Sequence, residues 1–159
     1  MHTSSPINDV TVTSESVEPP SWTERYEAFL RWTLQKLDVR GVEFSVVFCD
    51  DETIRGLNAT YRDRDEVTDV LSFVADEGAS VPAIPGQRYR PIGDILIDLE
   101  RVRAQADEND VPYEEEIRRV SVHGVLHLLG ETHTGYDFAN EPMLRHQEVL
   151  VQEYKEILF

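Results

Sequence analysis

The sequence predicts a layered structure of strands and helices, of the α/β or α+β class, folded as one domain. Short apolar runs alternate with segments whose apolar residues recur at helical spacing. The chain has 159 residues, of which 40% are hydrophobic and 29% charged, as is usual for a globular domain. We expect one domain over residues 21–159. Residues 1–20 are rich in Ser, Thr, Pro and Glu and are expected to form a disordered tail.

The first expected helix covers residues 21–37. Its apolar side chains, from Trp22 to Leu37, recur every three or four positions and form one stripe. Ser21 is the expected N-cap, with Glu24 three residues on as its capping-box partner. The apolar run that follows, which ends at the chain's single cysteine, is expected to be a buried strand over residues 44–49.

Capping residues, apolar runs and Gly or Pro residues predict the remaining elements. Asp50 or Asp51 can cap a short helix. Residues 76–91 are rich in Gly and Pro and are expected to form a loop. Gly130 is expected to end a long helix whose second half is apolar nearly all round, which indicates a buried central helix. The elements expected after the first strand are a helix carrying Ile54, Leu57 and Tyr61, strands at residues 69–74 and 95–97, and helices at about residues 99–109, 113–129 and 141–158.

The chain is strongly acidic, with 31 Asp and Glu residues against 15 Lys and Arg residues and a formal net charge of -16. Its long-range field repels phosphate, so composition alone does not indicate nucleic-acid binding, and we expect no DNA partner. No apolar run is long enough to span a membrane, and the first residues do not resemble a secretory signal. One cysteine excludes an internal disulfide. We therefore expect a cytoplasmic protein with no membrane partner.

Three of the five histidines fall within eleven positions, at His123, His127 and His133. His123 and His127 are four residues apart and would lie on one face of a helix, one turn apart. Gly130 lets the chain turn back, so that His133 reaches the same ion. Three neutral nitrogen ligands with an open fourth position are the pattern of a catalytic zinc site. The sequence predicts one zinc ion at these three histidines.

The same spacing, H-x-x-x-H-x-x-G-x-x-H, is the frame of the metzincin peptidases. Those enzymes carry a glutamate directly after the first histidine as general base, whereas this chain has Gly124 there. A peptidase would need a carboxylate from elsewhere, and Glu131 is the nearest in sequence. Met143, where metzincins place a methionine turn, is more simply explained as a core residue. A zinc metallopeptidase-like hydrolase therefore stays an alternative.

Four runs of residues together resemble the YbeY family of bacterial rRNA maturation factors, also described as single-strand endoribonucleases. They are L-N-A-T-Y-R at residues 57–62, T-D-V-L-S-F at 68–73, G-D-I at 93–95 and H-G-V-L-H-L-L-G-E-T-H at 123–133. The family pattern carries similar runs in the same order, and the resemblance covers about residues 22–158. Two positions depart from the pattern, because Val67 replaces a proline and Thr132 replaces an aspartate.

The resemblance implies an α+β fold, in which a small mixed β-sheet packs against several helices and a zincin-like central helix carries the metal ligands. It implies a zinc-dependent single-strand endoribonuclease that acts in rRNA maturation, notably small-subunit rRNA 3′-end processing, and in ribosome quality control. The expected partners are ribosomal RNA, the small ribosomal subunit and its assembly factors. A further alternative is a non-catalytic ribosome-assembly factor in which the zinc is structural.

Arg62 matches the functional arginine of the family, so the resemblance implies a catalytic role for it. Attack on a phosphodiester builds negative charge on the phosphoryl oxygens, and a guanidinium can bind two of them at once. The alternative is a surface salt bridge between Arg62 and Asp63 or Asp65. Four more arginines would form a basic groove with Arg62 if the fold gathers them, namely Arg55, Arg64, Arg88 and Arg90.

Overall fold

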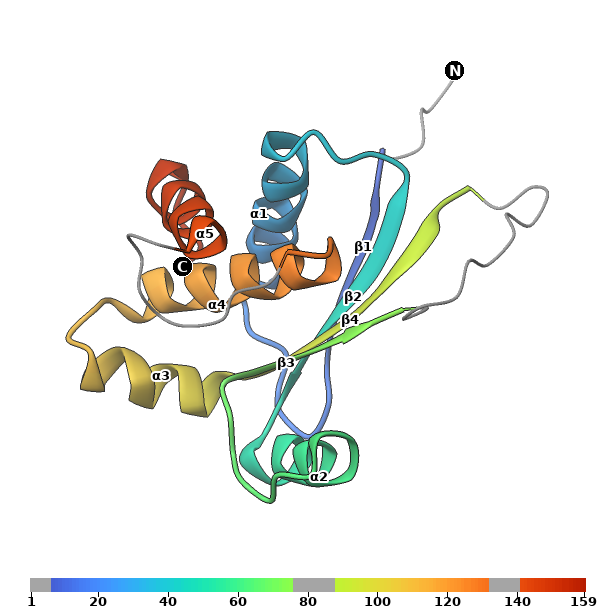
Figure 1. Cartoon of the computed structure of the whole chain (residues 1–159). Coiled ribbons are helices and arrows are strands. Elements are labelled where there is room, and N and C mark those ends of the chain that lie inside the picture. The colour runs from blue at the N-terminus through green and yellow to red at the C-terminus, as the bar shows by residue number, and fades with distance from the viewer. Residues whose placement is uncertain (1–6, 76–87, 132–140) are drawn as a thin grey trace.

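The computed structural model describes residues 7–75, 88–131 and 141–159, which form a four-stranded sheet with helices on both faces (Figure 1). The strand order is β1-β2-β4-β3, in which β1, β2 and β4 are parallel and β3 is antiparallel to β4. This mixed sheet confirms the α+β class. The elements are β1 (Asp9–Ser14), α1 (Thr23–Lys36), β2 (Val42–Cys49), α2 (Asp51–Arg62), β3 (Val70–Val74), β4 (Arg90–Asp98), α3 (Leu99–Glu108), α4 (Tyr113–Leu128) and α5 (Pro142–Glu153).

Alternating side chains of the strands build a separate hydrophobic core on each face of the sheet. Phe44, Val46 and Phe48 of β2 pack into the larger core, which α1, α4 and α5 complete. Cys49 turns to the other face and joins Ile54 of α2 in the smaller core. Figure 1 shows α2 on the opposite side of the sheet from α1, α4 and α5. None of the helices in these ranges is long and apolar enough to cross a bilayer.

The N-terminal segment differs from the expectation of a disordered tail over residues 1–20. Residues 9–14 form β1, which pairs in parallel with β2, and Val10 is buried in the larger core. An edge strand that buries one face needs few apolar residues, and Val10 and Val12 supply them at alternate positions. The tail prediction is therefore wrong for these six residues, and residues 1–6 lie outside the described part of the chain.

Several element boundaries also differ from the prediction. The N-cap of α1 is Trp22 with no side-chain cap bond, so the predicted capping box at Ser21 is wrong. β4 begins at Arg90, five residues before the predicted strand, because it pairs with both β2 and β3. α5 ends at Glu153 rather than near residue 158, since the chain turns back and Leu158 N–H donates to a carboxylate oxygen of Glu114 in α4.

Two glycines let α4 lie close against the sheet. Gly93 of β4 has φ of +141°, and a Cβ there would lie 2.1 Å from the Phe73 carbonyl oxygen and 2.7 Å from Leu128 Cδ2. Gly124 of α4 faces Ile95 of β4, and a Cβ would lie 3.0 Å from Ile95 Cδ1. These contacts fix the distance between α4 and the β4–β3 edge of the sheet.

We predict that Gly93→Ala lowers the free energy of unfolding by about 3 kcal/mol or more, because the added methyl meets backbone and is strained at positive φ. Gly56→Ala is the matched control, since Gly56 lies within α2 and no atom of the described residues is within 4 Å of its Cβ position. That control should gain roughly 0.5–1 kcal/mol from helix propensity. Urea unfolding of both variants measures the difference, and a Gly93→Ala protein within 1 kcal/mol of wild type would contradict the close contact.

Candidate metal centre

α4 places His123 and His127 on one face, a single turn apart. Their Nε2 atoms are 3.1 Å apart and their ring centroids 4.6 Å apart. Two nitrogens bound to one tetrahedral zinc ion at about 2.0–2.1 Å lie roughly 3.3–3.4 Å from each other. Both side chains are half-buried rather than enclosed in the core. The donor pair therefore fits one metal ion with only a small movement of the rings.

The chain turns just after α4, as expected from Gly130 in the sequence. Gly130 has φ of +95°, and Glu131 N–H donates to the Leu126 carbonyl oxygen at 2.9 Å. Residues 132–140, which include His133, lie outside the described residues. The role of His133 as third ligand therefore stays a prediction.

One pocket of about 460 Å³ brings the two histidines together with Arg62. Its walls come from the end of α2, from β3, which follows α2 in the chain, and from α4, which is distant from both in sequence. Asn58 holds the α2–β3 connection in place, because its side-chain amide donates to the Glu66 carbonyl oxygen at 3.0 Å. The lining residues are Asn58, Arg62, Arg64, Val70, Leu71, Ser72, Val74, His123, His127 and Gly130.

Arg62 is held at the pocket by β3 rather than by a carboxylate. One of its terminal nitrogens donates to the Ser72 carbonyl oxygen, and its guanidinium carbon lies 5.5 Å from the Phe73 ring centroid. Asp65 instead binds Arg55 Nε at 2.7 Å. Within the described ranges Arg62 forms no ion pair within 4.0 Å, so the expected alternative of a salt bridge to Asp63 or Asp65 is not what positions it.

The basic groove anticipated from five arginines is smaller in the structure. Arg64 lines the pocket beside Arg62, and its exposed side chain reaches Glu66 at 3.6 Å. Arg55 forms a salt bridge with Asp65, and Arg88 and Arg90 are not among the residues that line this pocket. The positive charge at the histidines therefore comes from two neighbouring side chains at the end of α2.

The position after the first histidine faces the sheet and not the pocket. The Ile95 side chain lies beside Gly124, and a Cβ at this position would be in tight contact with it, 3.0 Å from Cδ1. Glu131, the other candidate base of a peptidase, lies 3.5 Å from His146 and does not line the pocket. Met143 is buried in the core of the α4–α5 layer, as expected. The described residues thus lack a carboxylate in the place of a peptidase base.

A group of three carboxylates, which sequence reasoning missed, lies at the N-termini of α2 and α3. Ligand atoms of Asp51, Asp98 and Glu100 lie within 4.8 Å of one another, close enough to hold a cation. Burial, together with the hydrogen bond and charge of Asp51, raises the pKa of Asp98 to about 7. Asp98 Oδ1 accepts from the N–H groups of Glu100 and Arg101, and Oδ2 has no donor among the described residues. Below about pH 7 the carboxyl group of Asp98 keeps its proton, and the three carboxyl groups then carry one negative charge less.

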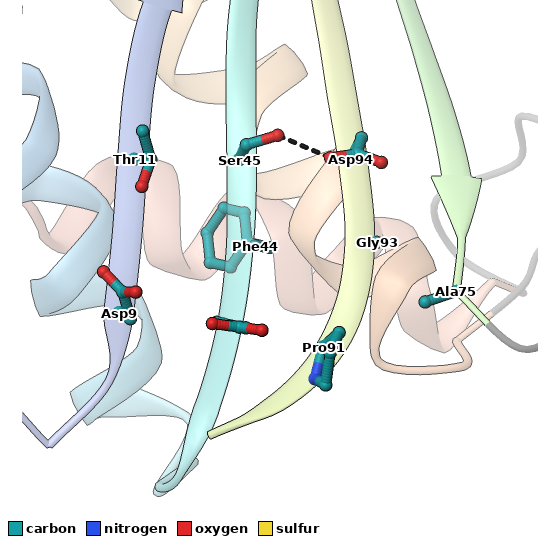
Figure 2. Close-up of a pocket in the computed structure, with 9 residues that line it drawn as sticks. Asp9, Thr11, Phe44, Ser45, Ala75, Pro91, Gly93 and Asp94 are labelled. Carbon is teal, nitrogen blue, oxygen red and sulfur yellow. Dashed lines mark hydrogen bonds between the residues drawn. The ribbon is translucent and has the colours of Figure 1, made fainter. Parts of the chain in front are cut away.

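The open face of the sheet carries a second, acidic pocket of about 240 Å³ (Figure 2). Asp9, Glu43 and Asp94 line it together with polar and small side chains. Ser45 Oγ donates to Asp94 Oδ1 at 2.5 Å and so joins β2 to β4, which is a structural role for Asp94. The pocket has no histidine or arginine in its lining, and its charge is unsuited to a phosphate group.

The α+β fold places a histidine pair and an arginine in one pocket, an arrangement suited to a metal-dependent hydrolase that acts on a negatively charged substrate. The family model described as Endoribonuclease YbeY matches residues 9–155. The chain belongs to this YbeY endoribonuclease family, which confirms the resemblance found in the sequence. Its enzyme class is that of a nuclease, a hydrolase that cleaves phosphodiester bonds within RNA.

Individual relatives agree over most of the chain. The Endoribonuclease YbeY of Treponema denticola is 38% identical over 142 residues, which cover 88% of this chain and 90% of that protein. That of Treponema pallidum (strain Nichols) is 38% identical over 154 residues, or 97% of this chain and 94% of that protein. The solution structure of TM1509 from Thermotoga maritima superposes with a TM-score of 0.62 at 26% identity, and covers 91% of this chain and 87% of that one.

We predict that Asp98→Asn stabilises the protein at pH 8. The folded-state pKa of Asp98, about 7, lies above that of an unfolded aspartate at about 3.9. The stability that its proton supports is thus complete below about pH 4 and is lost as the pH rises through 7. Asparagine stays neutral and still caps α3. Urea unfolding should give the variant an advantage on the order of 2 kcal/mol at pH 8, which shrinks toward pH 4.

Asp50→Asn is the control of opposite sign. Asp50 caps α2, and its hydrogen bonds with Thr53 lower the pKa of its carboxyl group. Its contribution is therefore present above the unfolded pKa of about 3.9 and is lost as the pH falls. The Asp50→Asn protein should lose stability relative to wild type at pH 8. A pH-independent difference between wild type and Asp98→Asn would contradict the raised pKa of Asp98.

Proposed function

We propose that the chain is a zinc-dependent, single-strand endoribonuclease of rRNA maturation. In this proposal it processes the 3′ end of the small-subunit rRNA and serves ribosome quality control in the cytoplasm, together with the small ribosomal subunit and its assembly factors. The observation that carries the proposal is the single pocket lined by His123, His127 and Arg62. In such a pocket the metal held by the histidines and the guanidinium of Arg62 would both contact the same phosphate group of the substrate.

The roles of the side chains follow from their chemistry. His123 and His127, with His133 as the proposed third ligand, would hold one zinc ion by imidazole nitrogens. When bound, zinc supplies a water molecule of lowered pKa and polarises a phosphoryl oxygen. Arg62 would donate to the phosphoryl oxygens as negative charge builds on them, which its position in the lining of the same pocket supports. The Ser72 carbonyl oxygen holds the Arg62 guanidinium in position for this contact.

The charge distribution supports a flexible single strand as substrate. The chain carries a formal charge of -16, and the open sheet face presents Asp9, Glu43 and Asp94. A single strand can bend one phosphodiester into the pocket beside Arg62 and Arg64, whereas a duplex would bring a second row of phosphates against acidic surface. The same repulsion favours delivery of the RNA by protein partners over capture of naked RNA from solution.

The peptidase alternative has little support in the pocket. Gly124 occupies the position of the peptidase base, and a side chain there would point at Ile95 of the sheet, with its Cβ in tight contact at 3.0 Å. The alternative of a structural zinc in a non-catalytic assembly factor makes a different prediction, because it requires a metal that stabilises the fold without supporting cleavage. Activity measurements on metal-loaded and metal-free protein separate this alternative from the proposal.

We predict that His127→Ala abolishes zinc-dependent cleavage of single-stranded RNA and that Arg62→Glu lowers kcat/KM by about 10²–10³-fold. The first variant removes a metal ligand, and the second replaces a phosphate-binding cation by a charge that repels the substrate. The measurement is cleavage of a labelled single-stranded RNA that carries the 3′ end of the small-subunit rRNA, with bound zinc quantified in each preparation. A casein-like protein is the test substrate for peptidase activity.

His146→Ala and Arg40→Glu are the matched controls for this experiment. His146 does not line the pocket, and Arg40 is an exposed arginine whose charge reversal alters the net charge as Arg62→Glu does. Both controls should cleave at the wild-type rate. RNA cleavage that survives the loss of zinc and of Arg62 would refute the proposed mechanism. Proteolysis would revive the peptidase, and bound zinc without any cleavage would favour the assembly factor.

A further inference from the structure

A chain of polar side chains leads from His123 into the interface between α4 and α5. His123 Nδ1 lies 2.6 Å from Gln147 Oε1, and Gln147 Nε2 donates to Glu148 Oε2 at 3.3 Å. Glu148 in turn accepts two hydrogen bonds from Arg119, at 2.7 and 2.8 Å. Gln147 is only 4% exposed, so its amide has to find partners within the protein. None of these three partners was singled out by the sequence motifs.

The charge of Glu148 sets the direction of the hydrogen bonds. Burial opposes ionisation of Glu148, but the hydrogen bonds and charge of Arg119 outweigh it and lower the pKa of its carboxyl group. An ionised carboxylate can only accept hydrogen bonds. Gln147 must therefore turn its NH₂ group toward Glu148, and this turns its carbonyl oxygen toward His123. An amide in the reverse orientation would place its oxygen against the carboxylate.

The orientation of Gln147 decides which nitrogen of His123 carries the proton. An amide oxygen only accepts, so Nδ1 of His123 has to be the donor. In the neutral ring, Nε2 then carries the lone pair, and this is the atom that lies 3.1 Å from His127 Nε2. An imidazole free in water favours the opposite tautomer, with its proton on Nε2. The protein environment must therefore reverse the intrinsic preference of this ring.

We propose that Gln147 is a positioning residue that holds His123 as the Nδ1-protonated tautomer and thereby aims the Nε2 lone pair at the metal. Glu148 and Arg119 act behind it, since they fix which end of the Gln147 amide faces the ring. The inference rests on the proposed function for the identity of the ligand, but the tautomer itself is a property of the metal-free chain. Hydrogen-bonded partners of this kind typically change metal affinity 10–100-fold when they are removed.

A purely structural role for Gln147 makes different predictions. Arg119 already joins α4 to α5, through Glu148 on α5 and Glu115 and Glu116 on α4. If Gln147 only fills space in this interface, its replacement would change stability and leave the His123 tautomer unaltered. A spectroscopic signal from the ring nitrogens therefore separates positioning from packing.

The experiment uses the full chain with ¹⁵N-labelled histidine, in wild type, Gln147→Leu, Gln147→Glu and the control Gln35→Leu. Gln35 is an exposed helical glutamine on α1, so the control makes the same substitution away from the site. NMR of the metal-free proteins reads the tautomer of His123, and competition with a chromophoric chelator reads zinc affinity. Wild type, Gln35→Leu and Gln147→Glu should all show Nδ1–H, because a carboxylate at 147 can accept the same bond.

Gln147→Leu should move the His123 population toward Nε2–H and weaken zinc binding about 10–100-fold. A variant that keeps the wild-type tautomer would overturn the proposal, even if it bound zinc less tightly. A changed tautomer with unchanged zinc affinity would also overturn it. If the wild-type protein bound no zinc at all, the proposed function would fail. The NMR measurement would still show whether Gln147 determines the tautomer of His123.

Discussion

The whole site depends on how closely α4 lies on the sheet. Gly93 accepts the approach of Leu128 from α4, and Gly124 accepts the side chain of Ile95 from β4. A methyl group has no space at Gly93 and would be in tight contact with Ile95 at Gly124, so these two points set the height of the helix above the sheet. That height places the face with His123 and His127 beside β3 and the end of α2, where one pocket can include Arg62.

The site also depends on a local reversal of charge. The chain as a whole repels phosphate, and the carboxylates of the open sheet face add to this repulsion. The positive charge of Arg62 is not neutralised by Asp65, because Asp65 forms a salt bridge with Arg55. Arg62 instead donates a hydrogen bond to the Ser72 carbonyl oxygen of β3. At the α4–α5 interface next to His123, the guanidinium of Arg119 forms salt bridges with three glutamates and so neutralises part of the acidic charge. Positive charge is therefore concentrated at the place where chemistry on a phosphodiester requires it.

Local patterns predicted the parts of the fold and site that are set by neighbours in sequence. The helix with His123 and His127, the turn at Gly130 and the cap at Asp50 all follow from spacing and residue type within a few positions. β1 was missed because an edge strand buries too few apolar residues to stand out.

Local sequence patterns could not predict contacts between segments that are distant in the chain. Gln147 lies 24 residues from His123, and Glu148 lies 29 residues from Arg119. The contact between Gly124 and Ile95, which shows that this position faces the sheet, is visible only once the sheet and α4 are packed.

X-ray absorption spectroscopy of the protein loaded with one equivalent of zinc tests the central claim most directly. A metal held by the histidines predicts a shell dominated by imidazole nitrogens at about 2.0–2.1 Å, with the multiple-scattering pattern of histidine rings. This signal should disappear in His127→Ala. A shell of oxygen atoms alone would place the metal at a group such as Asp51, Asp98 and Glu100, and would contradict a histidine-bound metal in the Arg62 pocket.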